Sequence, residues 1–117
     1  MKRAADLSLL QGTLDLMVLK GLERGADHGY GVARWVREVT DGVLEVEDGA
    51  LYTSLHRLER RGWVESSWGV SENNRKAKYY ELTVAGRRQL TAEAKAWTRY
   101  ADAVFKVLGQ ARAGRSA

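Results

Sequence analysis

Cationic side chains gather in two short segments and give the clearest chemical signal in the chain. Arg57 and Arg60 lie three residues apart in one of them. The other segment holds Arg75, Lys76 and Lys78. Guanidinium and ammonium groups donate hydrogen bonds to phosphate oxygens, and arginine does so with a planar fork. These segments therefore predict contacts with the phosphates of a nucleic acid, against the alternative of a merely solvated charged surface.

Residues that carry catalysis or bind metals are scarce. The chain has no cysteine and two histidines, His28 and His56. The carboxylates are scattered, and the sequence contains neither a nucleophile–base pair nor a glycine-rich phosphate loop. His28 precedes a Gly-Tyr-Gly sequence and is better interpreted as a turn or capping residue than as a metal ligand. We therefore expect no enzyme, no metal site and no cofactor.

Composition indicates a basic globular domain. The chain has 117 residues, a formal net charge of +4 and 44% hydrophobic residues, which is enough for one domain with a core. It contains no apolar run typical of a signal peptide and none of about 18 residues that could span a membrane. From these features we expect a cytoplasmic protein that does not associate with membranes.

The spacing of apolar residues predicts a mainly α fold with a small β-hairpin. Gly42 and Gly62 are placed to end two of the helices, and Thr83 is placed to cap the last one. Asp15 and Glu23 are interpreted as surface charges on the first helix. The expected helices span residues 9–24, 30–40, 49–61 and 84–108, and the expected strands span 63–68 and 77–82, with a further brief strand at 43–46.

Three compact helices followed by a hairpin are the order of a winged helix-turn-helix. In the third helix, Leu51, Leu55 and Leu58 share one face, so this face packs on the core. The opposite face is polar and cationic, and the major groove of B-DNA accommodates one helix. Residues near the N-terminus of such a helix usually reach the bases. The predicted DNA-binding residues are Tyr30, Gly49, Tyr52, Thr53, His56, Arg57, Arg60, Arg75, Lys76 and Lys78.

Two of these assignments have a structural alternative. Tyr30 begins the second helix, where its hydroxyl and the free N–H groups can hold a phosphate, but it could equally be a core aromatic residue. Gly49 stands near a base in one interpretation and is only a helix-capping residue in the other. The sequence alone leaves both alternatives open.

Several short segments occur in a specific order and spacing along the chain. They are Leu10-Gln11-Gly12-Thr13-Leu14-Asp15, His28-Gly29-Tyr30-Gly31, Leu51-Tyr52, Leu55-His56-Arg57-Leu58-Glu59, Gly62-Trp63-Val64-Glu65, Glu72-Asn73-Asn74-Arg75, Tyr79-Tyr80-Glu81-Leu82-Thr83 and Gly86-Arg87. Taken together, these segments resemble the PadR family of transcriptional regulators in its short form, which has a single C-terminal helix. Thr53 stands where that family usually has proline. The resemblance implies a cytoplasmic dimeric repressor that binds inverted repeats and is released by a small aromatic or hydrophobic effector.

The last helix carries a heptad pattern that predicts a homodimer, because an unpaired apolar stripe would face water. Its dimerisation positions are Leu90, Ala94, Trp97, Ala101, Val104 and Leu108. Small residues flank Trp97, so paired tryptophans could frame a flat cavity for a planar aromatic effector; the alternative is plain dimer packing. The residues of this effector pocket would be Met17, Trp97, Tyr100 and Phe105.

The sequence therefore predicts a winged helix-turn-helix at residues 1–83, a dimerisation helix at 84–109 and a disordered tail at 110–117, which form one structural unit. Its expected partners are double-stranded DNA, a second copy of the chain and a small effector. A winged-helix module that binds another protein without specific DNA binding is the alternative. Such a module would be expected to have a neutral or acidic third helix and hairpin, whereas both are basic here.

Overall fold

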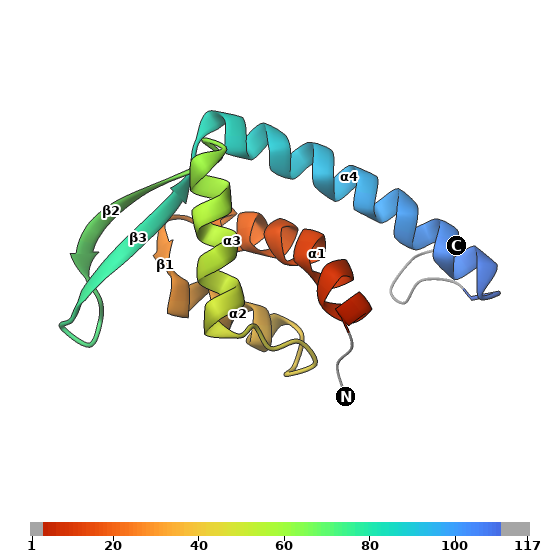
Figure 1. Ribbon diagram of the computed structural model, residues 1–117, viewed down its shortest axis with the longest axis horizontal. Helices are drawn as coiled ribbons and strands as arrows, with labels where there is room; N and C mark the ends of the chain where they lie inside the picture. Colours follow the sequence, from red (N-terminus) through yellow and green to blue (C-terminus); the bar gives the residue numbers. More distant parts are fainter. Residues whose placement is uncertain (1–3, 111–117) are drawn as a thin grey trace.

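Four helices and one small antiparallel sheet make up the chain in the computed structural model, which describes residues 4–110 and the side chains from residue 12 (Figure 1). The elements are α1 (Ala4–Glu23), β1 (Asp27–His28), α2 (Gly29–Val39), α3 (Asp48–Arg60), β2 (Val64–Val70), β3 (Lys76–Leu82) and α4 (Val84–Val107). The prediction of a mainly α fold with a hairpin is confirmed. The expected disordered tail lies, beyond Gln110, outside the described residues.

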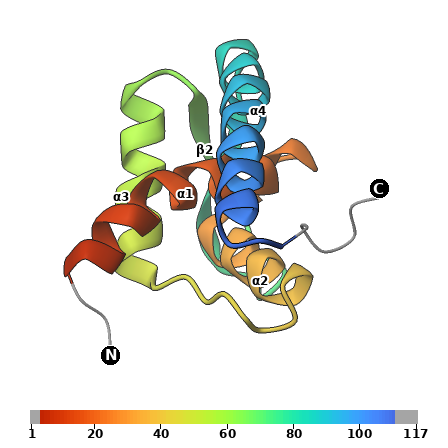
Figure 2. The same ribbon diagram turned by 90° about the vertical axis from the view of Figure 1, so that its right-hand side faces the viewer.

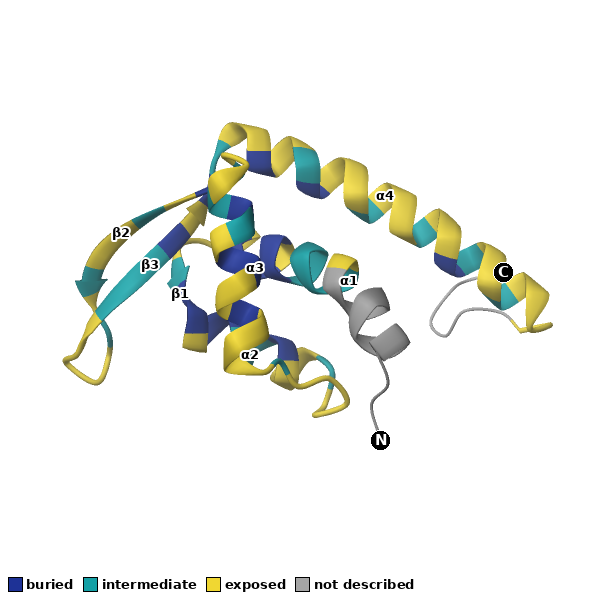
Figure 3. Cartoon of the chain, viewed as in Figure 1, coloured by how far each residue is buried: buried dark blue, intermediate teal, exposed yellow. Residues whose placement is uncertain are grey.

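The core forms where α1, α2 and α3 meet the base of the hairpin and the start of α4. Its centre is aliphatic, with Leu19 and Leu55 almost completely buried, and Tyr80 enters it from β3. The buried faces of the helices point inward in Figure 3, while their outer faces are exposed. Burial of this apolar surface is the main force that holds α3 in place, with its polar face toward solvent.

The hairpin is a regular antiparallel pair that runs from Val64 opposite Leu82 to Val70 opposite Lys76. We call β2, β3 and the turn at residues 71–75 the wing. β1 adds two residues to the free edge of β3, so the strand order is β1-β3-β2. The wing is thereby joined directly to the residue that precedes α2.

The strand expected at residues 43–46 is absent, and that prediction was wrong. The segment is bound to the end of α2 instead, because the N–H groups of Val43 and Leu44 donate to the carbonyl and side-chain oxygens of Thr40. Gly42 adopts a left-handed φ of 80°, as its predicted role in ending α2 requires. The third strand of the sheet forms instead at Asp27–His28, which pairs with the free edge of β3.

Side-chain caps fix the start of two helices. His28 Nδ1 accepts from the N–H of Gly31 at the start of α2, at 3.0 Å. Thr83 Oγ1 accepts from the N–H of Gly86 at the start of α4, also at 3.0 Å. Both capping predictions are confirmed. A Cβ at Gly86 would collide with the carbonyl oxygen of Trp63, so α4 begins in close contact with the base of the wing.

Helix α4 leaves the wing, packs on α1 and continues beyond the core (Figures 1 and 2). Its apolar stripe is therefore covered unevenly. Leu90 belongs to the core of its own chain, Ala101 is buried and Ala94 is half-buried. The remaining positions predicted to lie at a dimer seam are exposed: Trp97, Val104 and Leu108. Among the described helices, none is long and apolar enough to cross a membrane.

Candidate nucleic-acid interface

A groove of about 630 Å³ lies between the wing, the start of α2 and one flank of α3. Its position follows from the fold, because β1 holds the start of α2 beside β3 and the core holds α3 beneath both. The residues that line it include His28, Tyr30, Arg34, Tyr52, His56, Trp68, Glu72, Lys76, Lys78 and Tyr80.

Half of the predicted DNA-binding residues meet in this groove. Tyr30 and Tyr52 come from two helices, and both are exposed, Tyr30 to 58%. The interpretation of Tyr30 as a core aromatic residue was therefore wrong. Its ring lies beneath the guanidinium of Arg34, with 5.5 Å between the guanidinium carbon and the ring centre. From the wing, Lys76 and Lys78 add two positive charges, and from α3 comes His56.

The other predicted residues lie outside the groove. Gly49, Thr53 and Arg60 are exposed on α3, so they add polar surface outside the groove. Arg75 is exposed in the turn of the wing. A Cβ at Gly49 would meet no atom within 4 Å, so packing does not require glycine at this position.

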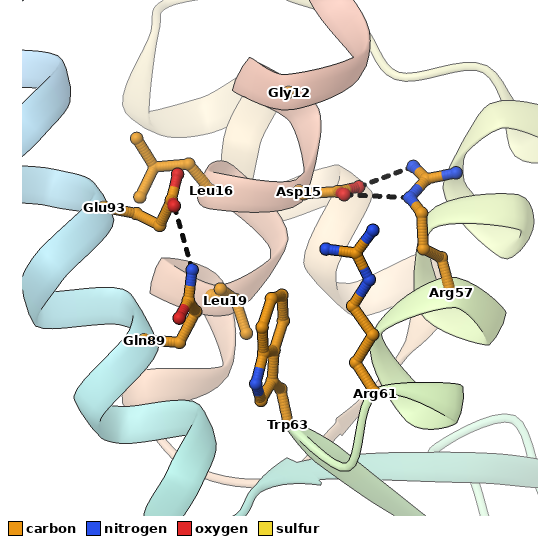
Figure 4. Close-up of a pocket in the computed structure, with 9 residues that line it drawn as sticks. All are labelled: Gly12, Asp15, Leu16, Leu19, Arg57, Arg61, Trp63, Gln89 and Glu93. Carbon is orange, nitrogen blue, oxygen red and sulfur yellow. Dashed lines mark hydrogen bonds and ion pairs between the residues drawn. The ribbon is translucent and has the colours of Figure 1, made fainter.

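Arg57 faces a different neighbour. Its Nε and Nη2 donate to the two carboxylate oxygens of Asp15 on α1, at 2.9 and 2.6 Å (Figure 4). The hydroxyl of Ser54, which is fully buried, donates to the same carboxylate at 2.6 Å. The hydrogen bond with Asp15 raises the pKa of Arg57 above its usual value. The fork of Arg57 is thus directed at α1, and the groove does not include it.

This contact also corrects the interpretation of Asp15. The sequence predicts a surface charge, but the side chain is only 19% exposed and fastens α1 to α3. A bidentate pair with a third donor is well suited to fix one helix against another. Glu23 behaves as predicted and forms an exposed ion pair with Lys20.

A second hollow, of about 380 Å³, borders the opposite flank of α3, between α1 and α4. In Figure 4 the guanidinium of Arg61 points into it over the indole of Trp63, and the two groups are 5.2 Å apart. On the α4 side, the amide of Gln89 donates to Glu93 at 2.8 Å. This hollow is separate from the groove between α3 and the wing.

Sequence reasoning missed a polar cluster at the top of the groove. Glu72, in the turn of the wing, contacts His28, which caps the start of α2, and Arg34, which lies in its second turn. The hydrogen bond from His28 is the largest cause that lowers the pKa of Glu72, so this carboxylate is ionised at neutral pH. The sequence shows both Glu72 and His28, but it gives no sign that these two residues, 44 positions apart, come into contact.

Comparison with known proteins decides which family has this geometry. The sequence model of the transcriptional regulator PadR-like family matches residues 18–92, which span the described elements from the C-terminal part of α1 into α4. The chain belongs to the PadR-like family of transcriptional regulators. The predicted resemblance and the predicted winged helix are thereby confirmed, and the family is one of regulators and not of enzymes.

Solved structures of transcriptional regulators share the fold. A PadR family transcriptional regulator from Eggerthella lenta is 32% identical, with a TM-score of 0.69 over 87% of both chains. A transcriptional regulator from Clostridium thermocellum has a TM-score of 0.75 at 24% identity, over 91% of this chain and 97% of that one. An uncharacterised protein of Lysinibacillus sphaericus is 24% identical over 82% of this chain and 88% of its own length.

Proposed function

We propose that this PadR-like regulator is a homodimeric repressor in the cytoplasm that binds an inverted-repeat operator. The observation that carries the proposal is the groove itself. It places the exposed tyrosines of α2 and α3 beside the cations of the wing, all on one side of the molecule. This is the distribution expected for a helix in the major groove with a hairpin over the adjacent phosphates.

Each element would have its own part in such a complex. The outward residues in the first half of α3, Gly49, Tyr52 and Thr53, would lie nearest the base edges. His56 follows one turn later on the same outward side. The exposed cations at the end of α3 and on the wing would contact phosphates: these are Arg60, Arg75, Lys76 and Lys78.

Dimerisation supports specific binding because one small module binds DNA weakly at physiological salt, whereas a linked second module adds effective concentration. The uncovered part of the α4 stripe offers a surface for a two-fold partner, since Val104 and Leu108 are exposed. A two-fold dimer would present two α3 helices to half-sites about one helical turn apart.

For the effector, we propose a small planar aromatic or hydrophobic molecule that binds between paired Trp97 side chains. Trp97 is 44% exposed, Tyr100 is exposed, and Met17 and Phe105 are half-buried in the single chain. A ligand shifts the equilibrium between two arrangements of the dimer only by binding one of them more tightly. Derepression would follow if the arrangement that binds the effector does not fit the operator.

For Trp97→Ala we expect a weaker response to effector with operator affinity nearly retained. The measurement is operator binding by fluorescence anisotropy, with and without an aromatic effector found by tryptophan quenching. The control is Trp35→Phe on α2, because Trp35 does not line the groove. Tyr30→Phe would not be suitable, because Tyr30 lies in the groove. If a folded Trp97→Ala protein lost operator binding and effector response equally, Trp97 would only pack the dimer.

The proposed function is tested with the DNA upstream of the protein's own gene. We expect binding in the nanomolar range that survives excess nonspecific competitor and weakens with salt. Lys76→Ala should reduce the slope of log affinity against log salt by about one unit, because one phosphate contact is lost. Lys20→Ala is the control, because it removes an equal charge from the last turn of α1, at a residue that does not line the groove.

Each of three results would contradict the proposal or a part of it. Binding that competitor abolishes, on this DNA and on genomic fragments alike, would exclude a sequence-specific regulator. An unchanged salt slope in Lys76→Ala would remove the wing from the interface. Loss of all DNA binding would favour a winged helix whose partner is a protein.

A further inference from the structure

Glu72 is the sole carboxylate among the described residues that line the groove, and it lies between two groups that suit a phosphate. Its Oε1 is 3.4 Å from Nε2 of His28, and its Oε2 is 3.6 Å from Nη2 of Arg34. Glu72 belongs to the turn of the wing, whereas its partners belong to α2 and its cap. The carboxylate therefore ties the wing to the start of α2.

The backbone fixes which atom of His28 faces Glu72 as a donor. Nδ1 accepts from the N–H of Gly31, so in the neutral ring the proton resides on Nε2. This proton points toward Glu72, and no positive charge on the ring is needed. The ring is buried and meets Tyr79 edge-on at 5.3 Å between ring centres. His28 thus presents a preoriented N–H to the groove.

The contacts of Glu72 are weak enough to be exchanged. Both distances exceed the usual range for a charge-assisted hydrogen bond. Glu72 is 63% exposed, and ion pairs at such exposure contribute little to stability. A phosphodiester of the DNA backbone presents two non-bridging oxygens, which share a full negative charge, to the same two donors. An ionised Glu72 that stayed in place would instead repel it.

We propose that Glu72 is an internal substitute for a DNA phosphate. In the unbound protein it occupies His28 and Arg34, and a backbone phosphate takes its place when the groove engages a duplex. The inference rests on the proposed DNA binding and deepens it in two ways. It adds His28 and Arg34 to the phosphate-binding residues, and it makes displacement of Glu72 a cost of every binding event.

The variant that tests this is Glu72→Gln, compared with Glu81→Gln. Both remove one negative charge from the wing. Alternation along β3 places Glu81 on the face opposite Tyr80 and Lys78, which line the groove. The probe is a mixed-sequence duplex of about 20 base pairs, titrated by anisotropy at low and moderate salt, so no operator is needed. Thermal melting of both variants checks that they fold.

We expect Glu72→Gln to bind the duplex about two- to fivefold more tightly, with a salt slope larger by about one unit. Glu81→Gln should change affinity less. The decisive comparison repeats Glu72→Gln in a protein that also carries Arg34→Gln. If Glu72 acts by occupying Arg34, then Glu72→Gln gives little further gain in affinity when Arg34 is already replaced.

Three results would overturn the proposal. The affinity gained by Glu72→Gln could be the same with Arg34 present and with Arg34 replaced, or the same as that gained by Glu81→Gln. Either result would mean that Glu72 acts only by general charge repulsion. Weaker binding by Glu72→Gln would mean that the carboxylate positions the wing for DNA. Failure of the wild-type protein and every variant to bind any duplex would instead remove the proposed DNA binding itself.

Discussion

Asp15→Ala is expected to lower the free energy of unfolding by about 2–3 kcal/mol, a large part of the stability of a domain this size. The variant leaves two groups without their acceptor. Arg57 keeps its charge at 15% exposure, and the buried hydroxyl of Ser54 loses the carboxylate to which it donates. Urea denaturation followed by circular dichroism measures the loss.

Glu23→Ala is the matched control, because it removes a carboxylate from the same helix. The ion pair of Glu23 with Lys20 is exposed, so we expect a loss within about 0.5 kcal/mol. The double variant Asp15→Ala with Arg57→Ala should lose less than the sum of the single variants, because it leaves no unpaired charge. Equal losses for Asp15→Ala and Glu23→Ala would show that the bond between α1 and α3 adds nothing.

Local pattern was sufficient for most of the fold. The 3.6-residue spacing of apolar side chains predicted α2, α3 and α4 to within one residue at each described end. The caps were equally readable, because His28 and Thr83 act on residues three positions later. In these cases the information and its structural consequence lie within one or two helical turns. The polar face of α3 follows from the same periodicity.

Contacts between distant segments were not readable in this way. Asp15 and Arg57 are 42 residues apart, and each fits a surface position on its own helix. One signal was present, since Asp15 stands between Leu14 and Leu16 on a largely apolar helix. Glu72 gave no such signal. Its role depends on where β1 places the start of α2, and a strand of two residues exists only because β3 pairs with it.

The predicted seam of α4 shows how one pattern can serve two purposes. Heptad spacing identifies an apolar stripe, but it does not say what covers each position. Leu90 is covered by its own chain, so its burial needs no second copy. Val104 lies about four turns further on, where α4 has passed the core, and it remains exposed. The dimer proposal therefore depends on the second half of the helix.

Val104→Glu is accordingly expected to convert the proposed dimer to a monomer and to weaken binding to the inverted repeat by 100-fold or more. Two glutamates would meet near the two-fold axis in an apolar interface and repel each other. Affinity for a duplex with a single half-site should stay unchanged, because α3 and the wing lie at the other end of the molecule (Figure 1). Analytical ultracentrifugation and anisotropy on both duplexes measure these effects.

Ala103→Glu is the control, because it adds the same negative charge to α4 but outside the apolar stripe. Ala103 is exposed and neighbours Val104, but a step of about 100° places it away from the apolar stripe. This variant should remain dimeric and bind the inverted repeat like the wild type. If Val104→Glu were also dimeric, the interface would lie elsewhere on the chain. If it were monomeric and still bound the inverted repeat tightly, the two half-sites would not need a preformed dimer.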